Sequence, residues 1–173
     1  MMIIRELMEK EQDKTAAFLL ALDEQDRYWR FCRPMTDDAV RAYAERIDWQ
    51  STTIIAAFDT QAQLAGILEL CDNGAAAEIA VAVARPFRGR GVGRALLDRA
   101  LLNAKARGKH SVTLTCLVEN EPMRRLARGA GLAAKAVDGE VEPVQVLENA
   151  RPEELAEHET GELMGSMTYA GAL

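Results

Sequence analysis

The residues whose types and spacing could do chemistry are concentrated in residues 85–108, which read RPFRGRGVGRALLDRALLNAKARG. In residues 88–94, here named the glycine loop, glycine occupies every second position among arginines, and an Ala/Leu-rich run follows at once. A helix start presents unpaired N–H groups and partial positive charge, which attract phosphate. Glycine lets a phosphate approach these groups, and guanidinium groups can bind its oxygens. The pattern therefore predicts a phosphate-binding loop.

Better-known phosphate loops do not fit this stretch. A P-loop requires a Lys-Ser or Lys-Thr pair, which is absent, and the G-x-G-x-x-G fingerprint requires glycine where Arg94 stands. A flexible loop and an RGG-like nucleic-acid segment are the remaining alternatives. The net charge of −6 and the directly following helix disfavour both. The helix is expected to be anchored by a buried stripe of Leu96, Leu97, Ala100, Leu101 and Ala104.

The elements that must position this loop follow from hydrophobic periodicity and turn residues. Strands are predicted at residues 2–7, 51–58, 63–70, 78–84, 110–118, 132–137 and 141–148. Helices are predicted at residues 9–22, 37–47, 91–107 and 120–131, with Thr36 and Asn120 as N-caps. Residues 23–34 are predicted to be a turn-rich link that carries aromatic side chains. This order indicates an α+β sheet with helices on its faces, in which residues 78–118 form a crossover between parallel strands.

Composition limits the remaining possibilities. The chain has 173 residues, of which 49% are hydrophobic and 28% charged, as expected for one globular domain. The acidic balance disfavours nucleic-acid binding. The three cysteines show no paired spacing, which favours a reducing compartment. The sequence has no signal peptide and no apolar run long enough for a membrane span, so we expect a cytoplasmic protein without membrane association. Two distant histidines give no sign of a metal site.

The segment Arg88-x-x-Gly91-x-Gly93, between a strand and a helix, resembles the acetyl-CoA-binding signature of the GNAT acetyltransferases. Residues 120–132 are similar to the Asn-led helix of that family, with Leu132 in its aromatic position. The resemblance implies the GNAT fold across residues 1–150. Residues 151–173 are predicted to be a tail, in which residues 152–164 form a short helix. That fold is a mixed, mostly antiparallel central sheet with helices on both faces and a V-shaped splay between its fourth and fifth strands.

Three segments are more narrowly similar to the acetyltransferase domain of bacterial Pat-type protein lysine acetyltransferases: residues 26–31, 77–81 and 119–128. The reaction this implies is direct transfer of acetyl from acetyl-CoA to an amine, with protein lysine as the expected acceptor. A small-molecule amine is the alternative acceptor. A non-catalytic sensor that binds acetyl-CoA or CoA is a third alternative, because Ala127 stands where many GNAT enzymes have a tyrosine general acid. The general acid and the oligomeric state, including a homodimer, stay open.

The resemblance also assigns roles to single residues. It implies that the pyrophosphate of CoA binds backbone N–H groups of Arg88, Gly89, Arg90, Gly91, Val92, Gly93 and Arg94. Pantetheine is expected beside the strand that holds Val81 and Val83, one of whose N–H groups could polarise the thioester carbonyl. Asn120 matches the family's Asn, which is expected near the cofactor. An ordinary N-cap is the alternative role, and the two roles do not exclude each other. Glu78 is the candidate general base, and partial burial would raise its pKa; a solvated strand-end glutamate is the alternative.

Overall fold

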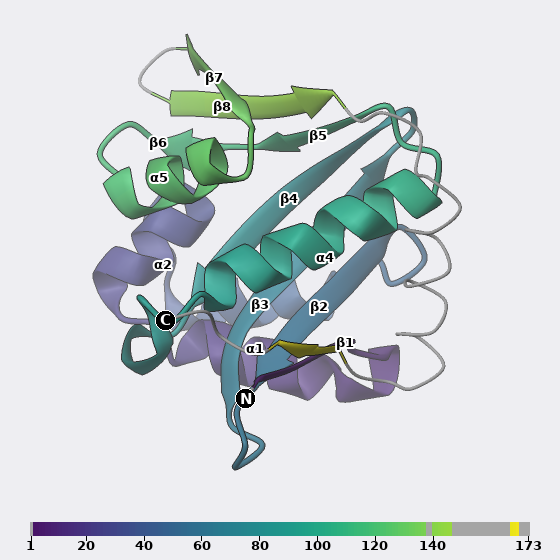
Figure 1. The fold of residues 1–173 in the computed structure, drawn as a ribbon. Helices are drawn as coiled ribbons and strands as arrows, with labels where there is room; N and C mark the ends of the chain where they lie inside the picture. Colours follow the sequence, from purple (N-terminus) through teal and green to yellow (C-terminus); the bar gives the residue numbers. More distant parts are fainter. Residues whose placement is uncertain (1, 138–139, 147–166, 170–173) are drawn as a thin grey trace.

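The structure is a computed structural model that describes residues 2–137, 140–146 and 167–169 (Figure 1). Its strands form one mixed sheet in the order β6-β8-β5-β4-β3-β2-β1-β9, with β7 paired to β8. The strands are β1 Met2–Glu6, β2 Thr52–Phe58, β3 Leu64–Asn73, β4 Ala76–Val83, β5 Ser111–Leu114, β6 Cys116–Leu117, β7 Ala133–Val137, β8 Glu140–Val146 and β9 Met167–Tyr169. In the part of the chain described, only β4 and β5 pair in parallel. The predicted α+β class and mostly antiparallel sheet are confirmed.

Helices cover both faces of this sheet, because its central strands are apolar on both sides. In β2, Ile55 and Ala57 pack into the core beneath α4 (Val92–Ala106) and α5 (Glu121–Gly129). Ile54 and Ala56 point to the opposite core, which α1 (Gln12–Leu20) and α3 (Asp37–Glu45) cover. Alternate residues of a strand face opposite sides, so this near-continuous apolar run serves two cores.

Helix α4 lies along the sheet as the sequence predicts (Figure 1). Most of its predicted stripe is fully buried, and Leu101 packs against the same core while partly exposed. The helix connects β4 to the parallel strand β5. Its buried face therefore fixes where its first turn, and the glycine loop before it, lie.

The pairing of β4 with β5 ends early. It runs from Ala76↔Ser111 to Ile79↔Leu114, whereas β4 stays paired with β3 as far as Val83↔Gly66. Beyond Ile79 the two strands diverge, toward the end of the sheet where α2 (Glu24–Phe31) lies (Figure 1). The expected splay between the fourth and fifth strands is confirmed.

The expected turn-rich link at residues 23–34 is wrong, because residues Glu24–Phe31 form helix α2. Asp23 caps this helix by accepting a hydrogen bond from the backbone N–H of Asp26 at 2.8 Å. Cys32 ends it in the left-handed conformation, with φ 53°. The helix has only eight residues, and among them only Asp26 is fully buried, so it lacks the apolar stripe that predicts helices.

Two further segments differ from prediction. The expected strand 110–118 is divided at Thr115 into β5 and β6, and both pair with β8. In the tail, the helix expected at residues 152–164 lies outside the described residues, and Met167–Tyr169 pair with β1 as β9. Among the described residues, no helix is long and apolar enough to span a membrane.

A buried ion pair ties α2 and α3 to the sheet. The guanidinium of Arg30 lies 2.5 Å from a carboxylate oxygen of Glu69 on β3, and the two side chains are 6% and 2% exposed. Tyr43 of α3 donates its hydroxyl hydrogen to the other carboxylate oxygen. Burial lowers the pKa of Arg30, but the charges and hydrogen bonds of Glu69 and Tyr43 together outweigh it, and the net direction is upward. Burial raises the pKa of Tyr43 to about 12. The three groups are thus held as a charged, hydrogen-bonded unit.

Removing one partner of this unit should destabilise the protein strongly. Glu69→Ala leaves the Arg30 guanidinium buried without its counter-charge, and we expect a loss of about 3 kcal/mol in the free energy of unfolding. Urea denaturation measures it. The control is Glu45→Ala, which removes an exposed carboxylate from α3. Equal stability of the two variants would contradict this account.

Candidate active site

The glycine loop uses its glycines for two different reasons. Gly89 and Gly91 have φ of 70° and 79°, a left-handed conformation that side chains disfavour. An added Cβ at either position would meet nothing within 4 Å, so backbone angle and not space requires glycine there. Gly93 is different: its Cβ would lie 3.3 Å from Leu126 of α5 and 3.5 Å from Val83 of β4. The third glycine therefore allows close packing of α4 at this point.

Helix α4 begins directly after Gly91, its N-cap, and its first turn is positioned to bind an anion. The backbone N–H of Ala95 donates to the carbonyl of Gly91 at 3.0 Å. Helix geometry consequently leaves the N–H groups of Val92, Gly93 and Arg94 without intrahelical acceptors. They add to the positive end of the helix dipole. The predicted helix start after the glycines is confirmed, and phosphate binding there stays a prediction.

One cavity of about 290 Å³ brings most of the predicted cofactor residues together; we call it the cofactor cavity. It lies where β4 has left β5, between the glycine loop and the start of α5. Predicted residues that line it are Val81, Val83, Arg88, Gly89, Gly91, Val92, Gly93, Arg94 and Asn120. Arg90 is not among them: its guanidinium lies over the Phe87 ring, 5.9 Å from the centroid, and it lines a neighbouring cavity.

The arginines of the loop differ in what their side chains contact. Arg88 donates from Nε to the carbonyl of Val83 at 2.9 Å and is 38% exposed. Arg94 instead bridges α4 and α5, donating to Asp98 at 2.7 Å and to the carbonyl of Gly129 at 2.6 Å. The side chain of Arg94 therefore helps to dock α5, while its backbone N–H stays at the helix start.

Asn120 takes the position that both of its expected roles require. It is the N-cap of α5, and its Oδ1 accepts a hydrogen bond from the N–H of Met123 at 3.2 Å. It is also buried and lines the cofactor cavity. Capping is confirmed, and contact with a cofactor stays a prediction.

Glu78 lies outside the cofactor cavity, one residue before the last β4–β5 pair. Its neighbours across the sheet are Cys71 on β3 and Thr113 on β5. Ala77 and Ile79 pack beneath α4, so Glu78 points to the opposite face of the sheet. The residue is exposed, so the partial burial considered from the sequence is not found.

A second cavity, of about 640 Å³, opens on that opposite face beside α3; we call it the α3 cavity. Tyr43, Glu69 and Cys71 line it, and Cys71 is the register neighbour of Glu78. Burial raises the pKa of the Cys71 thiol, and the charges of Glu69 and Glu78 act in the same direction. Glu78 itself lines neither cavity; it lies beside Cys71 on the face of the sheet where the α3 cavity opens.

Sequence reasoning missed Asp26, Arg30 and Glu69. Asp26 and Arg30 both line the cofactor cavity and are four residues apart, on one face of α2. Their spacing would have been informative only if residues 24–31 had been predicted as a helix. Glu69 sits within an apolar strand, where a lone carboxylate signals a buried partner. Among the described residues, no group of His, Cys, Asp or Glu side chains is arranged to hold a metal ion.

Comparison with known proteins agrees with this geometry. The model of the "Acetyltransferase (GNAT) family" matches residues 17–132, more than half of the chain. The GNAT domain of S. lividans PAT superposes with TM-score 0.71 at 23% identity, over 83% of this chain and 89% of that one. Spermidine N-acetyltransferase from Vibrio cholerae, in complex with CoA and spermine, gives TM-score 0.68 at 19% identity, over 86% and 96%.

A GNAT-family acetyltransferase from Streptococcus pneumoniae gives TM-score 0.66 at 16% identity, over 86% of this chain and all of that one. No protein of curated function matches the sequence significantly. The structural neighbours are too distant in sequence to identify an acceptor, but the family match and the splayed sheet agree. The chain belongs to the GNAT family of acetyltransferases.

Proposed function

We propose that this acetyltransferase moves the acetyl group of acetyl-CoA directly to a protein lysine. The observation that carries the proposal is the cofactor cavity at the splay, where the open side of β4 meets the start of α4. The glycine conformations and the unpaired N–H groups there suit a diphosphate. Arg88 adds a guanidinium beside them.

The chain's own groups supply the remaining needs of the reaction. Acetyl-CoA brings an acetyl group as an activated thioester. A backbone N–H of Val81 or Val83, beyond the last β4–β5 pair, donates to the thioester carbonyl and stabilises charge on its oxygen. Glu78 accepts the proton of the acceptor ammonium, whose ordinary pKa is about 10. The free amine then forms a C–N bond with the acetyl carbon, the C–S bond breaks, and CoA leaves as its thiolate, which takes a proton from water. The amine enters from the α3 cavity, since Glu78 faces that side.

Protein lysine is favoured over other amines by the Pat-like segments of the sequence, residues 26–31, 77–81 and 119–128. The likeness to the GNAT domain of S. lividans PAT agrees with this choice. A small amine is the second candidate, and the likeness to spermidine N-acetyltransferase favours it. Radiolabelled acetyl-CoA, offered with a bacterial lysate and separately with an amine panel that includes spermidine, separates the two. Label in protein supports lysine, and label only in small amines overturns it.

Replacing Glu78 tests the general base. Glu78→Gln removes the proton acceptor but keeps the size of the side chain, so kcat at neutral pH should fall by about a hundredfold or more. The affinity for CoA, measured by calorimetry, should not change. The control is Glu45→Gln on α3, which removes a distant exposed carboxylate. An unchanged kcat excludes Glu78 as the base. If the wild type binds CoA but acetylates nothing, the sensor alternative replaces the catalytic one.

Replacing Gly91 tests the loop. Gly91→Ala places a side chain at φ 79°, which costs about 1 kcal/mol and shifts the N–H groups of the loop. We expect weaker CoA binding by about tenfold, measured by calorimetry. Gly74→Ala is the control: Gly74 has φ 66° and equal space, but it lies in the β3–β4 turn at the far end of β4. If the two variants bind CoA equally, the loop does not bind the cofactor.

A further inference from the structure

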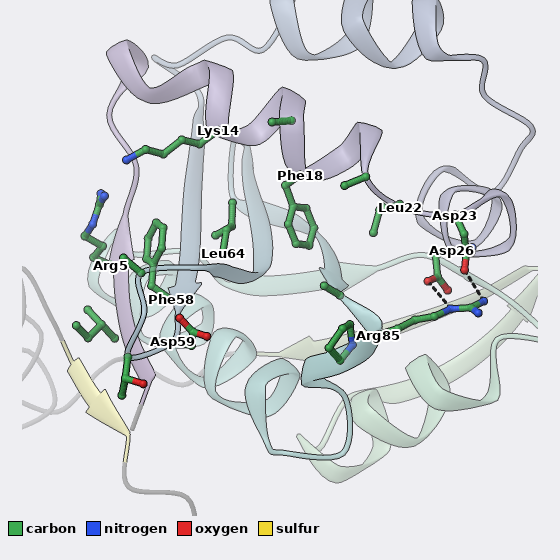
Figure 2. A pocket seen from close by; sticks show the side chains of 17 residues that line it. Arg5, Lys14, Phe18, Leu22, Asp23, Asp26, Phe58, Asp59, Leu64 and Arg85 are labelled. Atoms are coloured by element: carbon green, nitrogen blue, oxygen red, sulfur yellow. Dashed lines mark hydrogen bonds and ion pairs between the residues drawn. The ribbon is translucent and has the colours of Figure 1, made fainter.

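Helix α2 carries a buried carboxylate, Asp26, that contacts two arginines: Arg85, just before the glycine loop, and Arg88, the first residue of the loop. One oxygen of Asp26, Oδ2, accepts from a terminal nitrogen of Arg88 at 2.6 Å and from Nε of Arg85 at 3.2 Å. The Asp26 side chain is 5% exposed, whereas the side chains of Arg88 and Arg85 are 38% and 61% exposed. Arg85 also lies 2.6 Å from Asp23, the cap of the same helix (Figure 2). Two arginines next to the glycines are thereby bound to the start of α2.

Asp26 stands in the wall between two cavities. It lines the cofactor cavity and also a neighbouring one of about 720 Å³, whose walls include Phe18 and Phe58 (Figure 2). Its other oxygen, Oδ1, is buried and has no hydrogen-bond partner. Burying a carboxylate is costly, and the contacts described for its side chain are those with Arg85 and Arg88. The placement of this carboxylate is therefore tied to the two arginines.

Arg88 is fixed at two points by these contacts. Its Nε donates to the carbonyl of Val83, and a terminal nitrogen contacts Asp26. A guanidinium has five N–H donors in a rigid plane, so holding two of them orients the others. Arg88 lines the cofactor cavity, where the remaining donors can meet an anion. A group that is already oriented loses less conformational entropy when it binds a ligand.

Charge balance gives a second reason for this arrangement. Residues 85–94 contain four arginines, which repel one another before an anionic ligand is bound. Asp23 and Asp26 offset the charges of the first two at the point where η2 (Arg85–Phe87) leads into the loop. The side chain of Arg94 is balanced separately by Asp98. The loop can thus keep its conformation while the phosphate-binding N–H groups stay available.

We propose that Asp26 is a positioning residue for cofactor binding: it holds Arg88, and with it the glycine loop, ready for the diphosphate of CoA. The inference rests on the proposed function, because it takes CoA as the ligand of the loop. Asp26 acts through Arg88 and does not contact the reacting atoms. Its loss therefore affects cofactor affinity and not the rate of the chemical step.

Calorimetry with CoA tests the proposal on Asp26→Asn. We expect CoA to bind about tenfold more weakly, because the charged hydrogen bond between Asp26 and Arg88 is weakened. The KM for acetyl-CoA should rise by a similar factor while kcat stays unchanged. Glu24→Gln is the matched control, since it removes an exposed carboxylate from the same turn of α2. Asp26→Asn binding CoA like Glu24→Gln, or losing kcat at unchanged KM, would overturn the proposal.

A double-mutant cycle separates positioning from a purely structural role. In an Arg88→Met background, Asp26→Asn should cause little further loss of CoA affinity, because the contact it serves is already gone. A full additional tenfold loss would show that Asp26 does not act through Arg88. If Asp26→Asn does not fold, Asp26→Glu replaces it: it keeps the charge but moves the carboxylate, and should still weaken CoA binding relative to Glu24→Asp. Equal binding would overturn the proposal.

The outcomes also separate this inference from the proposed function. Wild-type protein that binds no CoA overturns the proposed function, and this inference with it. Wild-type protein that binds CoA, with Asp26→Asn matching its control, overturns only the role of Asp26.

Discussion

The rest of the site depends on where the β4–β5 pairing stops. A parallel pair normally satisfies the backbone groups of both strands. Here the last pair is Ile79↔Leu114, and β4 continues to Val83 with β3 as its only strand partner. The side of β4 that faced β5 is therefore open to other groups beyond Ile79, such as the side chain of Arg88. The cavity, the glycine loop and α5 are all arranged around that opening.

Helix α2 links the parts of this arrangement that lie far apart in the sequence. Through Asp26 it contacts the arginines before and within the glycine loop, and through Arg30 it pairs with Glu69 on β3. Arg30 and Asp26 also line the cofactor cavity, while Glu69 lines the α3 cavity on the other face. Phe31 packs partly against the core, but no apolar residue of this short helix is fully buried, and its buried contacts to the loop and the sheet are charged. The helix therefore connects the side of the sheet where the acetyl donor is expected with the side where the acceptor amine is expected.

The sequence predicts the sheet, four of its helices and most of the cavity lining because these depend on local patterns. Short sequence segments are enough to predict the buried stripe of α4, the helix caps at Thr36 and Asn120, and the left-handed glycines. It fails for α2, whose partners are Arg85, Arg88 and Glu69, between 39 and 62 residues away from Asp26 or Arg30. No periodicity reports such pairs. For Glu78 the structure agrees with the alternative of a solvated strand-end glutamate and not with partial burial.

Strand β9 has a consequence for how this molecule meets other chains. By pairing with Met2, Ile3 and Ile4 it occupies the outer side of β1 with a segment from the opposite end of the chain. An unpaired edge strand can pair with a strand from another chain, which leads to aggregation. In the part of the chain that the structure describes, the strand at this edge is Met167–Tyr169. Because β9 takes up this side of Met2, Ile3 and Ile4, a strand from another chain cannot pair with them there.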